Sequence, residues 1–355
     1  MQRVSIYPAA YDTCREAVDR AFDLFAPTLT DKTVLVKPNV LRESQAEDGI
    51  VTHPAVLQAV VERIAESSPA AIIVGDNPGA FSYGANEASF RTAGLMEASK
   101  GYYRNIGTDP VDVPFNAAFA ERIRISREVL DADVIISLPK FKTHGLTTLT
   151  GAVKNSYGVI PGAQKARLHL LAGDPWRFGE LVVDVFGLRV PDLFIVDAVV
   201  GMEGNGPASK DLRSIGKILA SDNAVALDAV IARMMGLDPA TLRFIQVAQE
   251  RGLGDLDPAA TEIIGELQAI QGFKLPPLAV TADDISPEIK NMLTNRTRLR
   301  PTVDDELCTR CGTCVDQCPA EALSMDADVP EVDPDKCITC FCCQEICPET
   351  AIKLS

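Results

Sequence analysis

Two segments of the chain, CTRCGTCVDQCP at residues 308–319 and CITCFCCQEICP at residues 337–348, repeat one cysteine pattern. In each segment three cysteines are spaced by two residues, and a fourth follows after three more residues and precedes a proline. Nine of the ten cysteines in the 355 residues lie between Cys308 and Cys347. Residues 1–10 lack the basic and then apolar start of a signal peptide, so we expect a cytoplasmic protein. In that reducing compartment the pattern favours thiolate metal ligands over disulfides.

This spacing is typical of bacterial two-cluster ferredoxins, in which the fourth cysteine of each run ligates the other cluster. We therefore expect two 4Fe-4S clusters, one on Cys308, Cys311, Cys314 and Cys347, and the other on Cys337, Cys340, Cys343 and Cys318. Structural zinc is the competing interpretation, but zinc sites need neither the third cysteine nor the Cys-Pro ending. Cys342 lies between ligands and is expected to be a spare thiol, whereas Cys14 is expected to be a small buried hydrophobe.

The segment that holds the two cysteine quartets differs in charge from the rest of the chain. Residues 302–355 contain 12 acidic and 3 basic residues, a net charge of −9 out of the total of −15. Residues 273–300 include Pro276, Pro277 and Pro287 and are typical of a connector. We therefore expect an α/β domain at residues 1–272, a linker at 273–300 and a ferredoxin domain at 301–355.

The first 272 residues alternate strand-like and helix-like segments. Strands rich in Val and Ile are expected at residues 3–7, 33–37, 71–76, 122–126, 133–138, 192–200 and 214–220. Helices are expected at residues 11–25, 54–66, 86–93, 147–157, 175–186, 222–235 and 240–251. This order predicts an α/β fold, a mostly parallel sheet with helices on both faces, followed by a small C-terminal α+β ferredoxin-type domain.

Composition excludes several classes of protein. Hydrophobic residues make up 46% and charged residues 23% of the chain, close to the globular average. No apolar run approaches the roughly 18 residues of a membrane span. The net charge of −15 argues against a surface for nucleic acid or for anionic membranes.

One region of this acidic chain contains no acidic residue. Residues 134–173 hold no Asp or Glu in 40 positions, where the chain average predicts about five or six. The region contains Lys140, Lys142, Lys154, Lys165, Arg167, His144 and His169. A solvated basic face is the simplest interpretation of such a run. However, Lys140 closely follows an apolar strand, and open α/β sheets bind ligands beyond the carboxyl ends of their strands, so we favour an anion site.

Polar residues also follow other predicted strands, and parallel strands would bring these ends to one edge of the sheet. We therefore expect an anion or substrate site formed by Lys37, Asn39, Asp76, Lys140, Lys142, Thr143, His144, Lys154, Asn155, Asp197 and Glu203. No G-x-G-x-x-G follows the first strand and no G-x-x-x-x-G-K-[ST] occurs, so neither a standard dinucleotide site nor a P-loop is supported.

Four short blocks, Lys37-Pro38-Asn39, LPKFKTH at 138–144, TGAVKN at 150–155 and GMEGNGP at 201–207, resemble the family catalogued as domain of unknown function 362. The resemblance covers roughly residues 4–250 and the cysteine-rich tail. It implies an iron–sulfur cluster-binding protein with a C-terminal ferredoxin module, working in anaerobic or low-potential metabolism. It implies no substrate.

These features together predict an iron–sulfur oxidoreductase or electron-transfer protein that passes electrons through two 4Fe-4S clusters to an anionic substrate or cofactor. Cationic side chains there would stabilise the negative charge of reduction. The candidate catalytic residues are Lys140, Lys142 and His144, with His144 or a desolvated lysine as proton donor. A redox partner is expected to dock near the acidic ferredoxin domain. The alternatives are a non-enzymatic electron-transfer adaptor and a protein that assembles or delivers a metallocofactor.

Overall fold

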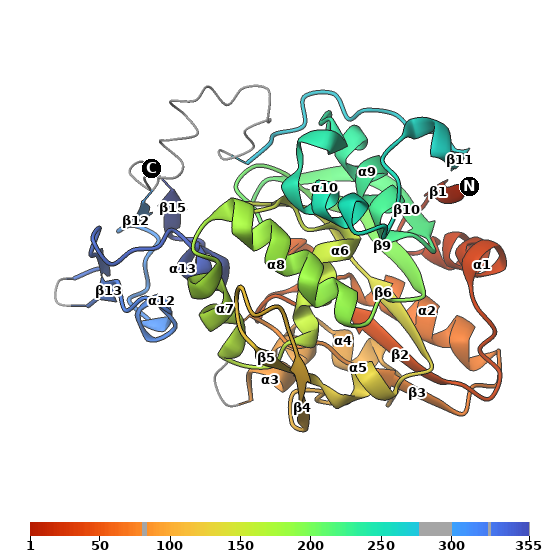
Figure 1. Cartoon of the computed structure of the whole chain (residues 1–355), viewed down its shortest axis with the longest axis horizontal. Helices are drawn as coiled ribbons and strands as arrows, with labels where there is room; N and C mark the ends of the chain where they lie inside the picture. Colours follow the sequence, from red (N-terminus) through yellow and green to blue (C-terminus); the bar gives the residue numbers. More distant parts are fainter. Residues whose placement is uncertain (80–83, 277–299, 326–327, 355) are drawn as a thin grey trace.

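The computed structural model describes residues 1–79, 84–276, 300–325 and 328–354 (Figure 1). A nine-stranded sheet forms its centre, in the order β11-β1-β10-β9-β6-β2-β3, with β7 beside β9 and β8 beside β7. These strands are β1 (Gln2–Pro8), β2 (Thr33–Pro38), β3 (Ala71–Val74), β6 (Val134–Leu138), β7 (Lys140–His144), β8 (Thr148–Leu149), β9 (Leu193–Met202), β10 (Leu212–Ser221) and β11 (Thr261–Gly265).

The sheet is mostly parallel, as the sequence predicts. Strands β3, β2, β6 and β9 pair in parallel, and β7 also runs parallel to β9. Strand β10 pairs antiparallel with both β9 and β1, whereas β1 pairs in parallel with β11. Because β2, β3 and β6 run the same way, the residues that follow them meet at one edge of the sheet.

Helices cover both faces of the sheet (Figure 1). Along β2, Leu35 packs into one core while Val34 and Val36 pack into the other, the two-residue alternation of a strand buried on both sides. The helices are α1 (Cys14–Phe25), α2 (Pro54–Ala65), α3 (Ala85–Thr92), α4 (Leu95–Ala98), α5 (Arg127–Asp131), α6 (Gly151–Asn155), α7 (Gln164–Ala172), α8 (Pro175–Leu188), α9 (Ala224–Met234) and α10 (Arg243–Glu250). Within the described part of the chain, none of them has the length and apolarity needed to cross a membrane.

Two predicted elements differ from the observed ones. The strand expected at residues 122–126 exists as β5 (Arg122–Ser126), but it forms a separate hairpin with β4 (Pro110–Pro114). Alternation identifies a half-buried strand without identifying its partner. Residues 147–157 are expected to form a single helix. They contain instead strand β8, helix α6 and the start of a 3-10 turn, η2 (Ser156–Val159). Thr148, at the start of this segment, has a φ of 67°, which no continuous right-handed helix allows.

The C-terminal part is small and has both helices and strands. Its elements are β12 (Pro301–Val303), α12 (Thr313–Asp316), β13 (Leu323–Ser324), β14 (Glu331–Val332), α13 (Cys342–Ile346) and β15 (Ile352–Leu354). Strand β12 pairs with β15 and β13 pairs with β14, both antiparallel. Figure 1 shows α13 on the side that faces the α/β domain. Most of the predicted linker, at 273–300, lies outside the described residues, so the domain boundaries stay predictions.

Candidate functional site

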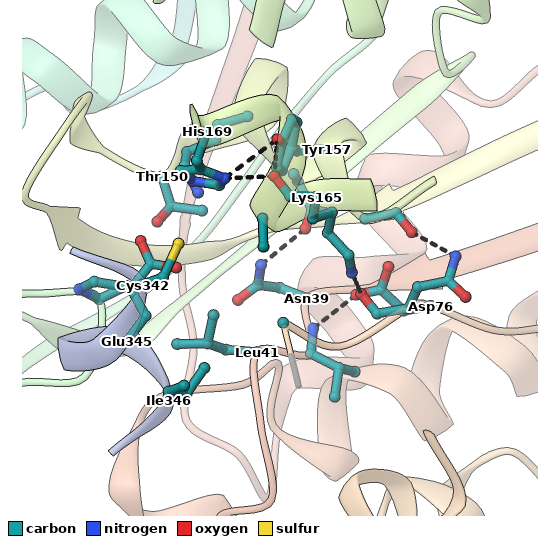
Figure 2. A pocket seen from close by; sticks show the side chains of 18 of the residues that line it. Asn39, Leu41, Asp76, Thr150, Tyr157, Lys165, His169, Cys342, Glu345 and Ile346 are labelled. Carbon is teal, nitrogen blue, oxygen red and sulfur yellow. Dashed lines mark hydrogen bonds between the residues drawn. The ribbon is translucent and has the colours of Figure 1, made fainter. Parts of the chain in front are cut away.

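A cavity lies where the carboxyl ends of β2, β3 and β6 meet helix α13 (Figure 2). Its volume is about 70 Å³, which is room for several water molecules or one small ligand. Lys142, Lys154 and Lys165 line it from the α/β domain, and Cys342 and Glu345 line it from α13. Both domains therefore build one site.

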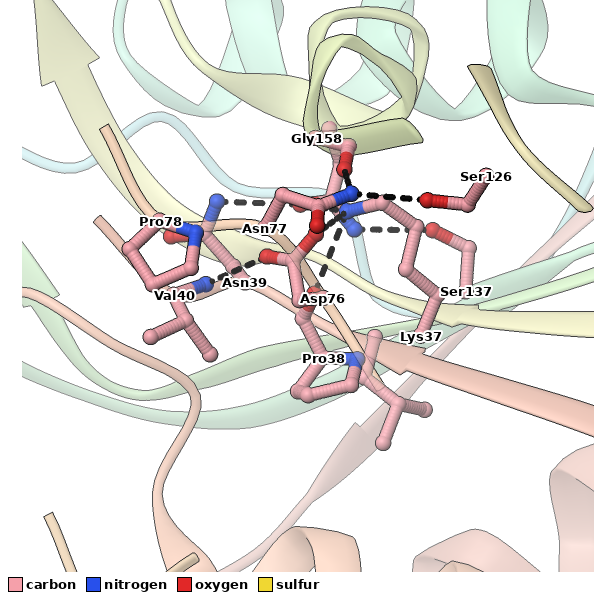
Figure 3. A network of polar contacts seen from close by, with 12 residues as sticks. Lys37, Pro38, Asn39, Val40, Asp76, Asn77, Pro78, Ser126, Ser137 and Gly158 are labelled. Carbon is pink, nitrogen blue, oxygen red and sulfur yellow. Dashed lines mark hydrogen bonds and ion pairs between the residues drawn. The ribbon is translucent and has the colours of Figure 1, made fainter. Parts of the chain in front are cut away.

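A buried ion pair lies at the β2 and β3 side of the cavity (Figure 3). Lys37 Nζ is 2.7 Å from Asp76 Oδ1, and Asp76 Oδ2 accepts a hydrogen bond of 2.9 Å from the Val40 amide. A Cβ on Gly158 would lie 2.1 Å from Asp76 Oδ1, so only glycine permits this approach. Burial lowers the pKa of Lys37, and Asp76 opposes that shift. Because the pair balances its own charge, it adds little net charge to the cavity.

Two other lysines satisfy their ammonium groups on backbone carbonyls. Lys142 Nζ donates to Ile50 O at 2.6 Å. Lys165 Nζ donates to Asn77 O at 2.5 Å and also to Pro78 O. Burial lowers the pKa of Lys142 well below its usual range and the pKa of Lys165 to about 7. A carbonyl orients an ammonium group without neutralising it, and a bound anion would favour the charged form of both lysines.

Lys154 completes this group, which we call the three cavity lysines: Lys142, Lys154 and Lys165. Its Nζ lies 6.0 Å from the ring centroids of both Tyr157 and Phe178. Among the described residues, none of the three cavity lysines is within ion-pair distance of a carboxylate. The carboxylates that line the cavity are Asp76, which pairs with Lys37, and Glu345. With its three lysines protonated, the cavity has more cationic than carboxylate groups and suits an anion.

Helix α13 contacts the α/β domain through Glu345 and His144. Glu345 Oε1 lies 2.9 Å from His144 Nε2, although the ring N–H is not aligned for a hydrogen bond. The other ring nitrogen, Nδ1, accepts from the amides of Leu146 and Thr147 at 3.1 and 3.3 Å, so the ring proton is on Nε2. Burial lowers the pKa of His144 to about 3, so the ring is neutral at pH 7.

Phe341, the residue before α13, anchors the same contact. Its ring belongs to the core of the α/β domain and is 3% exposed. A Cβ on Gly145 would lie 3.1 Å from that ring, which shows how closely the two segments approach. Gln344 Nε2 donates to Asn205 O at 3.3 Å on the same side. These contacts bring the second cysteine quartet against the cavity wall.

The structure divides the predicted site residues into two groups. The group that lines the cavity consists of Asn39, Asp76, Lys142, Lys154 and Asn155, with Lys37 paired to Asp76. The others lie outside the cavity lining. Lys140 Nζ is 2.8 Å from Asp197 Oδ2 in a fully buried pair. Thr143 packs against Gly206, His144 faces Glu345, and Glu203 lies 3.4 Å from Arg213.

Several cavity residues were absent from the predicted site. Lys165 and His169 lie on α7, and Tyr157 lies on η2. The acid-free run offered a signal, because it extends to residue 173 and includes all three. The sequence contains no signal for Cys342 and Glu345, since their place in the cavity depends on how two distant segments pack.

The crossed ligation stays a prediction, and the structure places cysteines of both quartets together. A second cavity, in the small domain, is lined by Cys308, Cys311, Cys314 and Cys347, which come from both quartets. Burial and then neighbouring thiols raise the pKa of Cys343, those neighbours being Cys340, Cys337, Cys314 and Cys318. Each fourth cysteine accepts a backbone amide four residues later, from Ala322 to Cys318 Sγ at 3.2 Å and from Ala351 to Cys347 Sγ at 3.3 Å. Amide bonds of this kind tune iron–sulfur clusters.

In the described ranges, no three His, Cys, Asp or Glu side chains converge on a point that one metal ion would occupy. A 4Fe-4S cluster is larger than a single ion, and each of its four irons takes one of the thiolates. The four cysteines that line the second cavity are as many as such a cluster needs.

Comparison with known proteins adds a family. A family described as domain of unknown function DUF362 matches residues 34–233, and a 4Fe-4S dicluster domain matches residues 300–348. A thylakoid-associated protein of Synechocystis is 35% identical over 272 residues, covering 72% of this chain and 80% of that protein. A crystal structure of a Thermotoga maritima protein aligns over 55% of this chain and 52% of its own, at 11% identity. Its TM-score of 0.37 is too low to indicate a shared fold.

The DUF362 match covers more than half of the chain and confirms the family resemblance of the sequence blocks. The dicluster match confirms an iron–sulfur module at the predicted position and supports electron transfer. The chain therefore belongs to the family of domain of unknown function 362 and carries a C-terminal 4Fe-4S dicluster domain.

Proposed function

We propose that the protein is an oxidoreductase that delivers electrons from its iron–sulfur module to an anionic substrate or cofactor in the lysine-lined cavity. One observation carries the proposal: α13, which contains Cys343 of the second quartet, forms a wall of that cavity. When bound, 4Fe-4S clusters supply electrons one at a time. A ligand in the cavity would thus lie directly against the segment that holds a cluster.

The three cavity lysines provide the electrostatic part of this function. Reduction adds negative charge to the ligand, and cations fixed around it stabilise that charge without reorganising. Lys142 and Lys165 are buried, which strengthens the effect because the local dielectric is lower than that of water. The same lysines favour binding of an anion before any electron arrives.

We assign proton donation to Lys165 in place of His144. Both ring nitrogens of His144 face protein groups, and its side chain lies outside the cavity lining. Lys165 lines the cavity, and two of its three N–H bonds are directed to the Asn77 and Pro78 carbonyls. Among the described residues the third has no partner, so it can face a ligand. Burial lowers its pKa to about 7, where a group can donate a proton and recover it from solvent.

The first quartet is suited to receive electrons from a partner. Cys311 is exposed, as are the neighbouring acidic residues Asp305, Glu306 and Asp316. A redox partner with a basic surface would be attracted to this face. We keep the cytoplasmic location and the anaerobic setting as predictions of the same proposal.

The proposal is tested with anaerobically purified, cluster-loaded full-length protein and two anionic probes, inorganic phosphate and malonate. We expect reversible reduction of the clusters and calorimetric binding of at least one probe. Lys142→Met and Lys154→Met should each weaken binding about tenfold or more, because each removes a charge-assisted hydrogen bond. Lys210→Met, at an exposed lysine away from the cavity lining, makes the same charge change and should leave binding unaltered.

Undiminished probe binding in both Lys142→Met and Lys154→Met would contradict the anion site. Clusters that cannot be reduced reversibly would contradict electron delivery and favour a structural role. Reversible clusters without binding of either probe would favour the electron-transfer adaptor.

A further inference from the structure

The cavity also contains hydrogen-bond acceptors that have no donor, and these restrict the kind of anion that fits. Asn39 Oδ1 and His169 Nε2 line the cavity, are buried, and have no hydrogen-bond partner in the described residues. Figure 2 shows Asn39 and His169 on the walls of the space that Glu345 and Cys342 close from the other side. This inference rests on the anion site proposed above and specifies its ligand.

The orientation of the Asn39 amide is fixed by its neighbours. The bond of 2.9 Å from Asn155 Nδ2 to Ser137 Oγ does not orient Asn155 by itself, because a hydroxyl can accept or donate. Lys37 Nζ, a donor only, requires the Asn155 oxygen on its side. That oxygen accepts from Asn39 Nδ2 at 2.9 Å and from Lys37 Nζ at 3.4 Å. Flipping Asn39 would place two oxygens against each other. Asn39 therefore keeps its Oδ1, an acceptor only, for the cavity.

The tautomer of His169 is fixed in a similar way. Its Nδ1 lies 2.8 Å from Lys165 O, and a carbonyl oxygen can only accept, so Nδ1 carries the proton. Tyr157 donates its own hydroxyl proton to the same carbonyl at 3.0 Å. Burial lowers the pKa of His169, so the ring is neutral and its Nε2 is a bare acceptor. The side chain is 7% exposed and stacks on Phe178 with ring centroids 4.4 Å apart.

A ligand that satisfies this cavity must carry negative charge and also donate hydrogen bonds. Sulfate or a plain dicarboxylate would pair with the three cavity lysines but would leave two buried acceptors unsatisfied, because neither donates a hydrogen bond at neutral pH. We propose that the ligand is a small hydroxylated anion, whose carboxylate or phosphate group lies on the lysines and whose hydroxyl groups donate to Asn39 Oδ1 and His169 Nε2. Thr150 Oγ1, a third buried group without a partner in the described residues, can accept or donate to the same hydroxyls.

Two matched probe pairs test this inference on the cluster-loaded full-length protein. Malate and succinate share two carboxylates and differ by one hydroxyl, and glycerol 3-phosphate and propyl phosphate share a phosphate and differ by two. We expect the hydroxylated member of at least one pair to bind about tenfold more tightly, as a hydrogen bond to a buried acceptor requires. The pair with the higher affinity identifies the anionic group.

The variants Asn39→Leu and His169→Phe identify the acceptors. Leucine has nearly the shape of asparagine, and phenylalanine keeps a ring against Phe178. In each variant the ratio of the affinity for the hydroxylated member to that for the plain member should fall towards one. The affinity for the plain member should stay unchanged.

Equal affinities within both pairs in the unmodified protein would overturn this inference and leave the anion site standing. Binding of no member of either pair would overturn both. Equal weakening of both members by each variant would also overturn the inference, because it would assign Asn39 and His169 a structural role only.

Discussion

The two cysteine quartets share one spacing, yet they face different surroundings. In the first quartet Gly312 has a φ of 77°, and at the equivalent position in the second, Phe341 has a φ of 63°. Asp316 of the first is exposed, whereas its equivalent in the second, Glu345, is 7% exposed. Every residue from Phe341 to Cys347 is buried. The ligand spacing thus specifies the cluster, and the residues between the ligands decide what each quartet contacts.

Phe341 shows the energetic side of this difference. A bulky residue with positive φ is strained, and glycine at the first quartet avoids that strain. The second quartet tolerates it because the ring is buried in the core of the α/β domain. Such strain persists where the surrounding structure compensates for it. Here the compensation is the contact between the two domains that the buried ring makes.

The largest effect is expected from breaking the ligand sets. If the fourth cysteines cross, Cys347→Ala and Cys308→Ala should leave the same residual electron paramagnetic resonance spectrum, and Cys318→Ala should match Cys337→Ala. Each variant should lose about half of the bound iron, since each removes one of two clusters. Cys342→Ala, which removes a cysteine outside the predicted ligand sets, is the control and should retain all the iron. If instead Cys318→Ala matched Cys308→Ala, and Cys347→Ala matched Cys337→Ala, the fourth cysteines would not cross.

The next effect comes from making the second quartet resemble the first. Phe341→Gly removes a buried ring, at a cost of about 3–5 kcal/mol, and relieves backbone strain worth about 1 kcal/mol. We therefore expect the free energy of unfolding to fall by roughly 2–4 kcal/mol, measured from denaturant midpoints. A Cβ at Gly312 would meet no described residue within 4 Å, so Gly312→Ala should cost only about 1 kcal/mol. Equal decreases in the free energy of unfolding for the two variants would show that Phe341 does not anchor the domain contact.

A smaller effect is expected from the paired carboxylates Glu345 and Asp316. Glu345→Gln removes a negative charge from the wall of a cavity that binds anions. Affinity for the anionic probes should therefore rise about three- to tenfold, as expected for one charge at partly screened distance. Asp316→Asn makes the same change on the exposed side and should alter probe affinity by less than about twofold. Calorimetry measures both affinities. An equal rise in probe affinity in both variants would indicate a general effect of net charge and contradict a specific role of Glu345.

The smallest effect concerns pH and Lys165. Its pKa of about 7 means that the ammonium group loses its proton as pH rises from about 6 to 8. Probe affinity should fall over this range in the unmodified protein, and the fall should be absent in Lys165→Met. The stability of the unbound protein should change in the opposite direction and rise with pH. Because the unfolded chain holds the Lys165 proton up to higher pH, the stability contribution of this group rises as pH increases above 7.

Much of the fold could be predicted from the sequence, because the core strands have local signals. Leu35 and its neighbours in β2 show the apolar run of a strand buried on both sides. The arrangement of the antiparallel strand β10 has no such signal, and the hairpin strand β5 has the same pattern as a sheet strand. Local alternation indicates that a strand forms, and long-range packing selects its partner.

The candidate site was predicted in part for the same reason. Asn39, Asp76 and Lys142 follow or lie near strand ends, so parallel topology was enough to bring them together. Lys140 and Lys142 are two residues apart, which in a regular strand places both on one face. A register irregularity between them directs Lys140 to Asp197 and leaves Lys142 at the cavity. Neither this irregularity nor the approach of Glu345 has a local sequence signal.

The central claim is that a ligand in the cavity lies against α13 of the second quartet, whereas the first quartet reaches the lining through Gln317. The most direct test is a redox titration of the cluster-loaded protein, followed by electron paramagnetic resonance, with and without malate or glycerol 3-phosphate at saturation. The account predicts that one of two cluster signals changes in potential, and that it is the signal lost in Cys337→Ala and Cys318→Ala. A change confined to the signal lost in Cys308→Ala, or no change in either signal, would contradict it.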